Sequence, residues 1–424
     1  MPKVCVIGGG ASGLMAAYAA ACRGAEVVLI EKNEKLGKKI YITGKGRCNF
    51  TNDVEPAEFL TNVVRGEKFL RGAIYSFSPQ KVMALMEEYG LSIKTERGNR
   101  VFPASDHASD VTKTLEKACK SMGVQILLSE KVTKILCSMS DICIMSNIVM
   151  SDKINMPRIV AVETDKNTYT CDYAIVATGG VSYPTTGSTG DGYAFAKAVG
   201  HTVVELKSAL CGLNLRGGLH KPLQGVSLKN VRLTAKFGGK TIFEEFGEML
   251  FTHFGISGPL VLSLSSCVNR LPLDKVSVFL DLKPALDEET LDKRLLRDFD
   301  KYKNKQIGNA LVELLPSKMI DSVLWVAKIP VKKNVNVLTK EERRTLLQTL
   351  KAFPLKVATL RPVEEAIVTS GGVSLQEIDP KTMESKRVLG LKFCGEVLDL
   401  DAFTGGFNMQ IAFSTGFVAG NTVK

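Results

Sequence analysis

Glycines near the N-terminus are spaced for chemistry on a nucleotide. Gly8, Gly10 and Gly13 directly follow a short apolar stretch, and an alanine-rich run comes next. In this spacing the first glycine makes a tight turn, the second lets the backbone approach a pyrophosphate, and the third lets a helix pack on a strand. Glu31 ends a second apolar stretch, where a carboxylate accepts hydrogen bonds from a ribose hydroxyl. The order strand, turn, helix, strand and acid predicts a dinucleotide site, and a purely structural turn is the plainer alternative.

A basic, glycine-rich loop follows at 37–49, with the sequence GKKIYITGKGRCN. Its cations predict a phosphate-neutralising role, and a solvated loop is the alternative. The loop also contains Cys48, beside Lys45 and Arg47. Contact with these cations would lower the pKa of the thiol. Whether Cys48 is reactive or only packed stays open at this stage.

Four later segments also contain glycines at positions suited to binding a cofactor. Residues 170–180 form a buried-strand pattern that runs into Ala-Thr-Gly, and the loop 187–193 leads into an alanine-rich helix. Both resemble cofactor-contacting segments of flavoproteins, although 187–193 also fits a plain helix-entry loop. In 391–396, Glu396 occupies the place of the acid that binds the ribityl chain in FAD proteins. Residues 405–410 open the last helix, whose N–H groups are expected to face the flavin pyrimidine edge and to stabilise negative charge there.

Length and composition limit the class of protein. The 424 residues exceed one ordinary core, so two or three domains are expected, and 45% apolar with 23% charged residues is typical of soluble globular proteins. No apolar run reaches the roughly 20 residues of a membrane span, and the N-terminus does not read as a signal peptide. The ten cysteines include no C-x-x-C pair. We therefore expect reduced thiols in the cytoplasm, no metal site and no redox dithiol.

The formal net charge of +11 has two interpretations. Nucleic-acid binding requires clustered cations with aromatic platforms. In this sequence Lys and Arg are spread along the chain, aromatic residues make up 7%, and there is one tryptophan. The sequence therefore favours a basic surface that attracts an anionic cofactor or substrate, and disfavours a nucleic-acid partner.

Periodicity along the chain predicts the supporting elements. Helical spacing occurs at 14–22, 79–90, 106–122, 286–330 and 339–351, the last with Thr339 as N-cap and Glu342 in the capping-box position. Strand patterns occur at 3–7, 27–30, 124–128, 132–136 and 366–373, with a hairpin edge or turn at 98–103. Residues 202–282 predict short antiparallel strands and a small barrel. The resulting domain prediction is 1–198 and 363–424 for the nucleotide-binding domain, 199–284 and 336–362 for the barrel, and 285–335 for a helical insert.

Stretches over nearly the full length resemble the BaiN/YhiN-like family of bacterial FAD-dependent oxidoreductases. They are IGGGASGLMAA, TGKGRCNFTN, Phe102-Pro103-x-Ser105-Asp106, ATGGVSYPTTGSTGDGY, GEMLFTHFGISGP, VTSGGV and CGEVLDLDAFTGGFNMQIAFSTG. The resemblance implies an α/β fold: a Rossmann-like FAD domain of the glutathione-reductase type, built from both chain ends. It also implies that an inserted β-barrel and a helical subdomain cover the flavin.

The activities that the resemblance implies diverge. One member of the family reduces ring double bonds of oxidised bile acids, and others resemble an aminoacetone oxidase. The 177–193 stretch is also similar to fumarate reductases and ketosteroid dehydrogenases. We therefore expect hydride transfer from flavin N5 to an enone of a steroid-like, bile-acid-like or similar small molecule. A peroxide-producing amine oxidase and a flavin-bearing RNA-binding or RNA-modifying protein are the alternatives.

The site prediction has a catalytic part and a cofactor part. The catalytic candidates are Tyr183, His253 and Arg100, for which packing on the flavin, capping a barrel turn and a surface cation are the respective alternatives. The residues predicted to bind FAD are Gly8, Gly10, Ala11, Ser12, Gly13, Glu31, Lys32, Lys38, Lys39, Gly44, Lys45, Gly46, Arg47, Cys48, Asn49, Val132, Thr178, Gly179, Gly180, Gly372, Gly395, Glu396, Gly406, Phe407 and Asn408. Because no second GxGxxG follows a strand, NAD(P)H is expected only as a transient electron donor. The expected partner is a small, anionic substrate, with no membrane; the oligomeric state stays open.

Overall fold

The computed structural model describes residues 1–138 and 156–424. The chain forms two compact units. The terminal unit comprises Met1–Lys207 and Val363–Lys424, and the inserted unit comprises Ser208–Pro362. The sequence-based division places the insertion at 199–362, whereas the compact inserted unit spans Ser208–Pro362. The reason is that strand β12 (Val203–Ala209) pairs with β20 (Val368–Val373), so most of β12 belongs to the terminal unit.

A five-stranded parallel sheet is the centre of the terminal unit, in the order β21-β11-β1-β2-β7. The strands are β1 (Lys3–Ile7), β2 (Glu26–Ile30), β7 (Gln125–Leu127), β11 (Tyr173–Val176) and β21 (Leu391–Phe393). Apolar runs suit this position because a parallel sheet is covered on both faces. In such a sheet ligands bind outside the carboxyl ends of the strands. The glycine loop follows β1 at that edge, as predicted.

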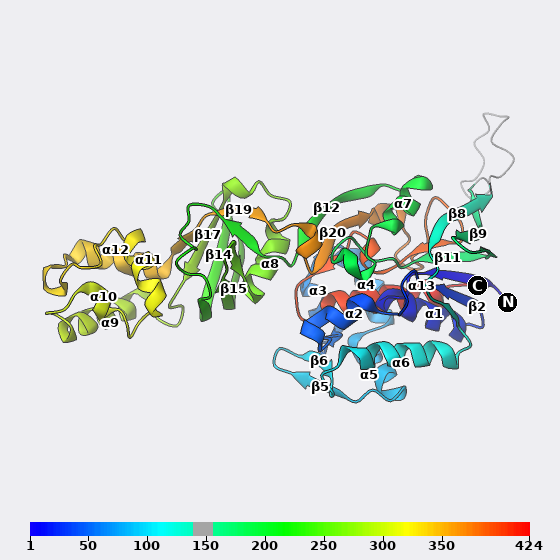
Figure 1. The fold of residues 1–424 in the computed structure, drawn as a ribbon, viewed down its shortest axis with the longest axis horizontal. Coiled ribbons are helices and arrows are strands. Elements are labelled where there is room, and N and C mark those ends of the chain that lie inside the picture. Colours follow the sequence, from blue (N-terminus) through cyan, green and yellow to red (C-terminus); the bar gives the residue numbers. More distant parts are fainter. Residues whose placement is uncertain (139–155) are drawn as a thin grey trace. The chain divides into compact units, whose positions relative to one another are not determined.

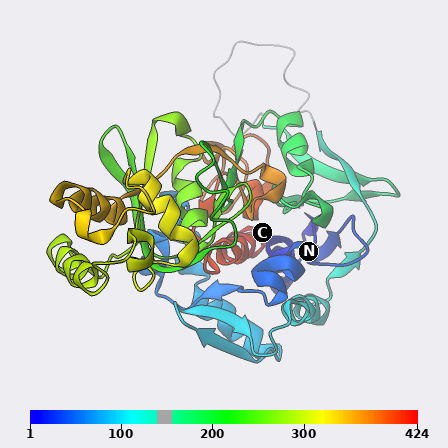
Figure 2. The same ribbon diagram turned by 60° about the vertical axis from the view of Figure 1, so that its left-hand side comes forward.

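Two helices from opposite ends of the chain lie side by side on this sheet, as Figures 1 and 2 show in blue and red. They are α1 (Ala11–Cys22) and α13 (Phe407–Asn421). A Cβ atom on Gly416 would lie 2.3 Å from the carbonyl oxygen of Ser12, and one on Gly420 would lie 2.2 Å from that of Ala16. Small residues therefore set the separation of these helices, and both chain ends are needed to build one core.

The remaining elements of the terminal unit surround this centre. They are α2 (Lys38–Ile42), η1 (Thr43–Gly46), β3 (Thr51–Asn52), α3 (Pro56–Thr61), β4 (Val63–Arg65), α4 (Glu67–Ser76), α5 (Pro79–Glu88), β5 (Ile93–Glu96), β6 (Arg100–Pro103), α6 (Ala108–Ser121), β8 (Val132–Ser138), β9 (Arg158–Thr164), β10 (Thr168–Thr170), η2 (Pro184–Thr186), α7 (Asp191–Ala198), η5 (Val363–Glu365), η6 (Leu375–Glu377), η7 (Gly395–Val397) and β22 (Asp401–Ala402). The helices predicted at 79–90 and 106–122 and the hairpin at 98–103 are confirmed. The strand predicted at 132–136 is confirmed as β8, although it joins a separate antiparallel sheet with β9 and β10.

The inserted unit contains a seven-stranded antiparallel sheet in the order β18-β17-β14-β15-β16-β13-β19. Its strands are β13 (Leu213–Leu215), β14 (Ser227–Phe237), β15 (Lys240–Phe251), β16 (Gly255–Ser257), β17 (Val276–Asp281), β18 (Phe353–Leu355) and β19 (Val357–Leu360). Only Lys356 separates β18 from β19, so one extended segment pairs with both ends of the sheet. This pairing closes the strands into a barrel, as predicted.

Helices complete the inserted unit: α8 (Pro259–Val268), α9 (Glu288–Lys301), α10 (Ile307–Ala310), α11 (Ser317–Val326) and α12 (Lys340–Lys351), with short turns η3 (Leu273–Lys275) and η4 (Val335–Val337). The predicted capping box of α12 is confirmed, because Thr339 Oγ1 accepts from the Glu342 N–H and the Glu342 carboxylate accepts from the Thr339 N–H. Leu346 and Leu350 of α12 share one buried core with Leu280 of the barrel. None of the helices in the described part of the chain is long and apolar enough to cross a membrane.

Candidate functional site: a dinucleotide cradle

The glycine loop between β1 and α1 combines crowded and open positions. Gly8 has φ +107°, and a Cβ there would lie 2.6 Å from the Ala177 carbonyl oxygen. A Cβ on Gly13 would lie 1.8 Å from the carbonyl oxygen of Gly8, whereas one on Gly10 would meet nothing within 4 Å. The protein itself therefore requires Gly8 and Gly13, while Gly10 borders open space. No side chain caps α1, so its first N–H groups face that space, which fits a pyrophosphate.

Glu31 is held rigidly at the carboxyl end of β2. Its Oε2 accepts from the Gly9 N–H at 2.7 Å, and its Oε1 accepts from the Asn33 N–H at 2.8 Å and from the Asn33 amide at 2.7 Å. The residue is buried. A fixed carboxylate at this point is suited to bind a ribose hydroxyl. Gly9 and Asn33 were not predicted as site residues, although both lie within two residues of predicted ligands.

Two buried polar atoms of the cradle are unsatisfied by the described residues. Asn49 Oδ1 and Thr178 Oγ1 are inaccessible to solvent and have no hydrogen-bond partner in 1–138 and 156–424. An unsatisfied buried polar group costs about 1–3 kcal/mol. Both residues belong to the set predicted to bind the cofactor. A polar ligand that supplies the missing partners would remove this cost, so these atoms also fit a dinucleotide.

A hydrogen-bonded cluster joins the two ends of the chain around Glu396. Its carboxylate accepts from Lys39 Nζ at 2.6 Å, from Ser182 Oγ at 3.0 Å and from the Thr369 N–H at 2.8 Å. Thr369 Oγ1 in turn accepts from the Ser182 N–H at 3.1 Å. Lys39 and Glu396 were predicted as separate ligands, and the structure brings them together. Ser182 and Thr369 were missed, although each lies inside a motif that carried the family resemblance.

The basic loop is held in an unusual backbone conformation. Gly44, Lys45, Gly46 and Cys48 all have φ between +58° and +89°. Left-handed conformations at two non-glycine residues are uncommon and are maintained only by surrounding structure. Cys48 is fully buried, and this burial raises the pKa of its thiol to about 12. The lowered pKa considered from the neighbouring cations is therefore wrong, because desolvation of the thiolate dominates.

The five cationic residues that were predicted to bind the cofactor differ in their ion-pair partners. Arg47 forms ion pairs with Glu96 and Asp106, and its guanidinium lies 4.4 Å from the Phe102 ring centroid. Three lysines also have carboxylate partners: Lys32 with Asp191, Lys38 with Glu34, and Lys39 with Glu396. Lys45 has no carboxylate partner among the described residues. Their contacts with a cofactor stay predictions, and Arg47 in addition stabilises the β5–β6 hairpin.

Close backbone approach also shapes the C-terminal part of the cradle. Gly406 has φ +97°, and a Cβ there would lie 2.3 Å from the Thr51 carbonyl oxygen. It precedes α13, whose N-terminus has no side-chain cap. Asn408 bonds both the N–H and the carbonyl of Ala402, so its amide fixes the turn before the helix. Phe407 is buried edge-on against Phe59.

The other predicted ligands occupy the same edge of the terminal unit or its neighbourhood. Ala11 and Ser12 form the first turn of α1, and Gly179 and Gly180 follow β11. Gly372 lies in β20, and Gly395 opens η7, where its N–H donates to Thr415 Oγ1. Val132 begins β8 and is buried. No bound group tests these assignments, which stay predictions.

The three catalytic candidates do not form one cluster within a single unit. Tyr183 has φ +51° and directly follows Ser182, which contacts Glu396. Arg100 is exposed on β6 and donates to the carbonyl of Arg97. His253 belongs to the inserted unit, where it is exposed at the β15–β16 turn and lies edge-on to Phe254. Of the three catalytic candidates, Tyr183 is thus the one that is next in sequence to a residue of the cradle, Ser182.

Comparisons with known proteins cover almost the whole chain. The family described as HI0933-like protein Rossmann domain matches residues 2–422. The 3-dehydro-bile acid delta(4,6)-reductase of Clostridium scindens is 30% identical over 99% of this chain and 98% of its own length. The ribosomal RNA dihydrouridine synthase of Escherichia coli is 30% identical over 97% and 95%. A 3-ketosteroid delta1-dehydrogenase structure from Sterolibacterium denitrificans shares the fold, with a TM-score of 0.52 and 12% identity over 99% of both chains.

Proposed function

The chain belongs to the HI0933-like Rossmann family and is an FAD-dependent oxidoreductase, and we propose that it reduces a carbon–carbon double bond conjugated to a carbonyl group. The names of two relatives support this reaction type. A delta(4,6)-reductase of 3-dehydro-bile acids and a dihydrouridine synthase both saturate a ring double bond next to a carbonyl. In such a bond the carbonyl makes the β-carbon electrophilic and stabilises negative charge on the α-carbon.

Each part of the cradle has a role in this proposal. The α1 N-terminus and Gly10 would hold the pyrophosphate, and Glu31 would accept hydrogen bonds from the ribose. The Lys39–Glu396 pair links α2 to η7, and the uncapped α13 N-terminus would stabilise negative charge on a bound flavin. When bound, and after reduction by NAD(P)H as a transient donor, FAD would supply the hydride to the β-carbon. Tyr183 provides the proton for the α-carbon.

We favour the uracil ring of an RNA as the substrate, and the distribution of charge carries this choice. The inserted unit has 25 Lys and Arg against 15 Asp and Glu, a net charge of +10, whereas the terminal unit has 30 against 29. The net positive charge of the chain is therefore concentrated in one unit, although the cations themselves occur in both, and this favours a nucleic-acid partner more than the sequence pattern does. Such an excess attracts a polyanion.

An anionic steroid-like or bile-acid-like enone is the second candidate, supported by the relative from Clostridium scindens. It undergoes the same hydride transfer, and the basic unit would attract its carboxylate as well. The two substrates differ in size and in number of charges. An amine oxidase is the remaining alternative, in which a small amine donates electrons and oxygen accepts them.

An anaerobic experiment with FAD-loaded protein separates these functions. The flavin is first bleached with NADPH or NADH and then mixed with a uridine-containing ribosomal RNA transcript, with a 3-oxo steroid that has a delta-4 double bond, or with buffer. We expect fast flavin reoxidation with the RNA, together with a gain of two hydrogen atoms per modified uridine by mass spectrometry. Reoxidation by the steroid alone would select the second candidate. Peroxide release with a small amine and no NAD(P)H would contradict both.

The role of Tyr183 has its own test. A Tyr183→Phe protein should bind FAD normally and be bleached at the normal rate, but should reoxidise about 100-fold more slowly with substrate because the proton donor is lost. His253→Ala is the control from the other unit. Normal reoxidation by Tyr183→Phe would remove Tyr183 as the proton donor, and unchanged turnover in His253→Ala would end the candidacy of His253.

A further inference from the structure

A lysine-rich segment lies in the helical part of the inserted unit. Between 301 and 340 the sequence has eight lysines and two acidic residues. Lys303, Lys305, Lys328 and Lys332 are all exposed. A surface that keeps exposed cations close together raises the local concentration of anions.

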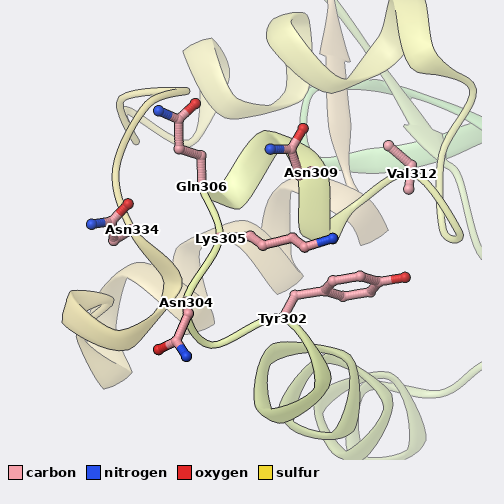
Figure 3. Close-up of a pocket in the computed structure, with 7 residues that line it drawn as sticks. All are labelled: Tyr302, Asn304, Lys305, Gln306, Asn309, Val312 and Asn334. Carbon is pink, nitrogen blue, oxygen red and sulfur yellow. The ribbon is translucent and has the colours of Figure 1, made fainter.

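A hollow of about 850 Å³ lies within this lysine-rich segment, and Figure 3 shows its lining. It is formed by the end of α9, the following loop, the short helix α10 and the loop before η4. The lining residues are Tyr302, Asn304, Lys305, Gln306, Asn309, Val312 and Asn334. None of these seven is acidic. All seven belong to the inserted unit, whereas the cofactor cradle is built from residues of the terminal unit.

Backbone hydrogen bonds hold the two loops of the hollow together. The Ile307 N–H donates to the carbonyl of Lys333 at 2.8 Å, and the Val335 N–H donates to that of Lys305 at 3.0 Å. The Asn336 N–H donates to the carbonyl of Lys303 at 3.1 Å. Main-chain pairing thus fixes the backbone from which the lining side chains extend. The hollow is therefore a formed feature of the fold.

The polar groups of the hollow are available to a ligand. The amide side chains of Asn304, Gln306, Asn309 and Asn334 make no hydrogen bond to any other residue in the described part of the chain. Tyr302 donates its hydroxyl to Glu313 at 2.6 Å, which fixes the ring, and Lys305 Nζ lies 5.3 Å from the ring centroid. Figure 3 shows Lys305 running alongside this ring. One aromatic ring, with Lys301 and Lys305 both within 5.3 Å of its centroid, and four amides without hydrogen-bond partners among the described residues therefore line the same hollow.

We propose that this hollow binds a single-stranded segment of RNA. Lysines at 303, 305 and 332 bind phosphates, Tyr302 offers an aromatic surface to a base, and the free amides match the donors and acceptors of base edges and ribose hydroxyls. An acidic peptide would use the lysines but would leave the ring and the amides without a function. The choice of RNA rests on the proposed function, whereas the location rests on the hollow itself.

The test measures RNA affinity without catalysis. FAD-loaded protein is titrated into a fluorescently labelled, uridine-containing RNA of about 15 nucleotides, comparable to known site sizes, at several salt concentrations. Lys305→Ala and Asn309→Ala are the test variants, because neither side chain supports the fold through a hydrogen bond or ion pair. Lys293→Ala is the matched control: it removes one positive charge from α9, where Lys293 pairs only with Glu289. Emission from Trp325, the single tryptophan, which lies 71% exposed on α11, checks that the subdomain is intact.

The variants have distinct expected results. Lys305→Ala should weaken binding about tenfold and reduce the slope of log affinity against log salt by about one. Asn309→Ala should weaken binding about fivefold with an unchanged slope, and Lys293→Ala should bind almost like the original protein. Equal losses in Lys293→Ala and Lys305→Ala, or tighter binding of an acidic peptide than of RNA, would overturn the proposal.

Failure of the proposed function gives a different pattern. If the protein reduces a steroid and not RNA in the anaerobic assay, but Lys305→Ala still weakens RNA binding selectively, the hollow remains an RNA site and the substrate assignment falls. If RNA is reduced and both test variants bind it normally, the hollow is not the docking site.

Discussion

The two units of this protein use charged residues in different ways. In the terminal unit cations and carboxylates are nearly equal in number, and most cations around the cradle pair with a carboxylate. In the inserted unit ten cations are in excess, and several lysines near the hollow are exposed. Paired charges fix the geometry of a site, whereas unpaired exposed charges attract a distant anion. The first unit is thus suited to hold one cofactor, and the second to attract a partner.

Glycines of the two units also differ in how closely other atoms approach them. The cradle depends on glycines where backbone meets backbone, as at Gly13 and Gly406. In the inserted unit Gly238 and Gly239 border open space, although Gly255 is as crowded by backbone as the cradle glycines. A single added methyl group should therefore do far more damage at a crowded cradle glycine than at one of these open positions. The following predictions test this contrast.

The largest effect is expected for Gly13→Ala. The new Cβ would overlap the carbonyl oxygen of Gly8, which forces α1 away from β1. We expect a loss of about 3 kcal/mol or more in the stability of the terminal unit, and no FAD binding. Gly238→Ala, at an open turn of the inserted unit, is a control for expression and handling, although its φ of +56° adds a small strain of its own. Thermal unfolding measures the stability of each variant, and FAD absorbance measures its bound cofactor. A stable, FAD-loaded Gly13→Ala protein would refute the close approach of Gly13 to the Gly8 carbonyl oxygen.

Gly10→Ala should separate cofactor binding from folding. Its φ of −83° suits alanine, and its Cβ would meet no protein atom within 4 Å. The apoprotein should therefore keep its unfolding temperature, while the methyl group intrudes where the pyrophosphate approaches. We expect FAD affinity to fall by about 100-fold, as for other displaced close contacts. Calorimetric titration of apoprotein with FAD provides the measurement, and normal affinity would place the pyrophosphate elsewhere.

Lys392→Met tests a buried charge in the terminal unit. Lys392 is fully buried on β21 and donates to Thr422 Oγ1 at 2.7 Å, and burial lowers its pKa to about 8. Between pH 8 and about 10.4 the unfolded chain binds more protons than the folded one, so stability should rise with pH through that window. Methionine should remove this rise and stabilise the unit at pH 7 by about 2 kcal/mol. Urea unfolding at pH 7 and pH 9.5 tests whether stability rises with pH. If the variant shows the same pH dependence as the original protein, groups other than Lys392 cause that dependence.

The smallest effect is expected for Thr339→Ala in the inserted unit. The substitution removes the side-chain oxygen that caps α12, which costs about 1 kcal/mol. Because the helix belongs to the other unit, FAD affinity should not change. Unfolding curves and FAD titration of the same sample check both points. Thr339→Ser, which keeps the oxygen, serves as the control and should unfold like the original protein.

Several features of the fold could be predicted because they depend on neighbours in sequence. The turn at Gly8 and Gly13, the two strands that flank α1 and the capping box at Thr339 each depend on residues a few positions apart, and all are confirmed. Local backbone sterics and periodic burial are sufficient to specify such features. The positions of Ser182 and Thr369 were not predicted, because polar residues within a glycine-rich motif have no spacing rule of their own.

Other features exist only because distant segments meet in the folded chain. Lys39 and Glu396 are 357 residues apart, and only the folded chain brings α2 and η7 into contact. The pKa of Cys48 follows from burial, which the adjacent cations Lys45 and Arg47 did not reveal. The barrel closes where β18 and β19 meet at Lys356, because β17 and β13 pair with these two consecutive strands. The local sequence determined the nucleotide-binding turn, because its chemistry is that of adjacent backbone atoms. Tertiary packing decided which charged residues are paired, which are buried and which unit carries the excess of positive charge. The reason is that ion pairing and desolvation depend on residues that only folding brings together.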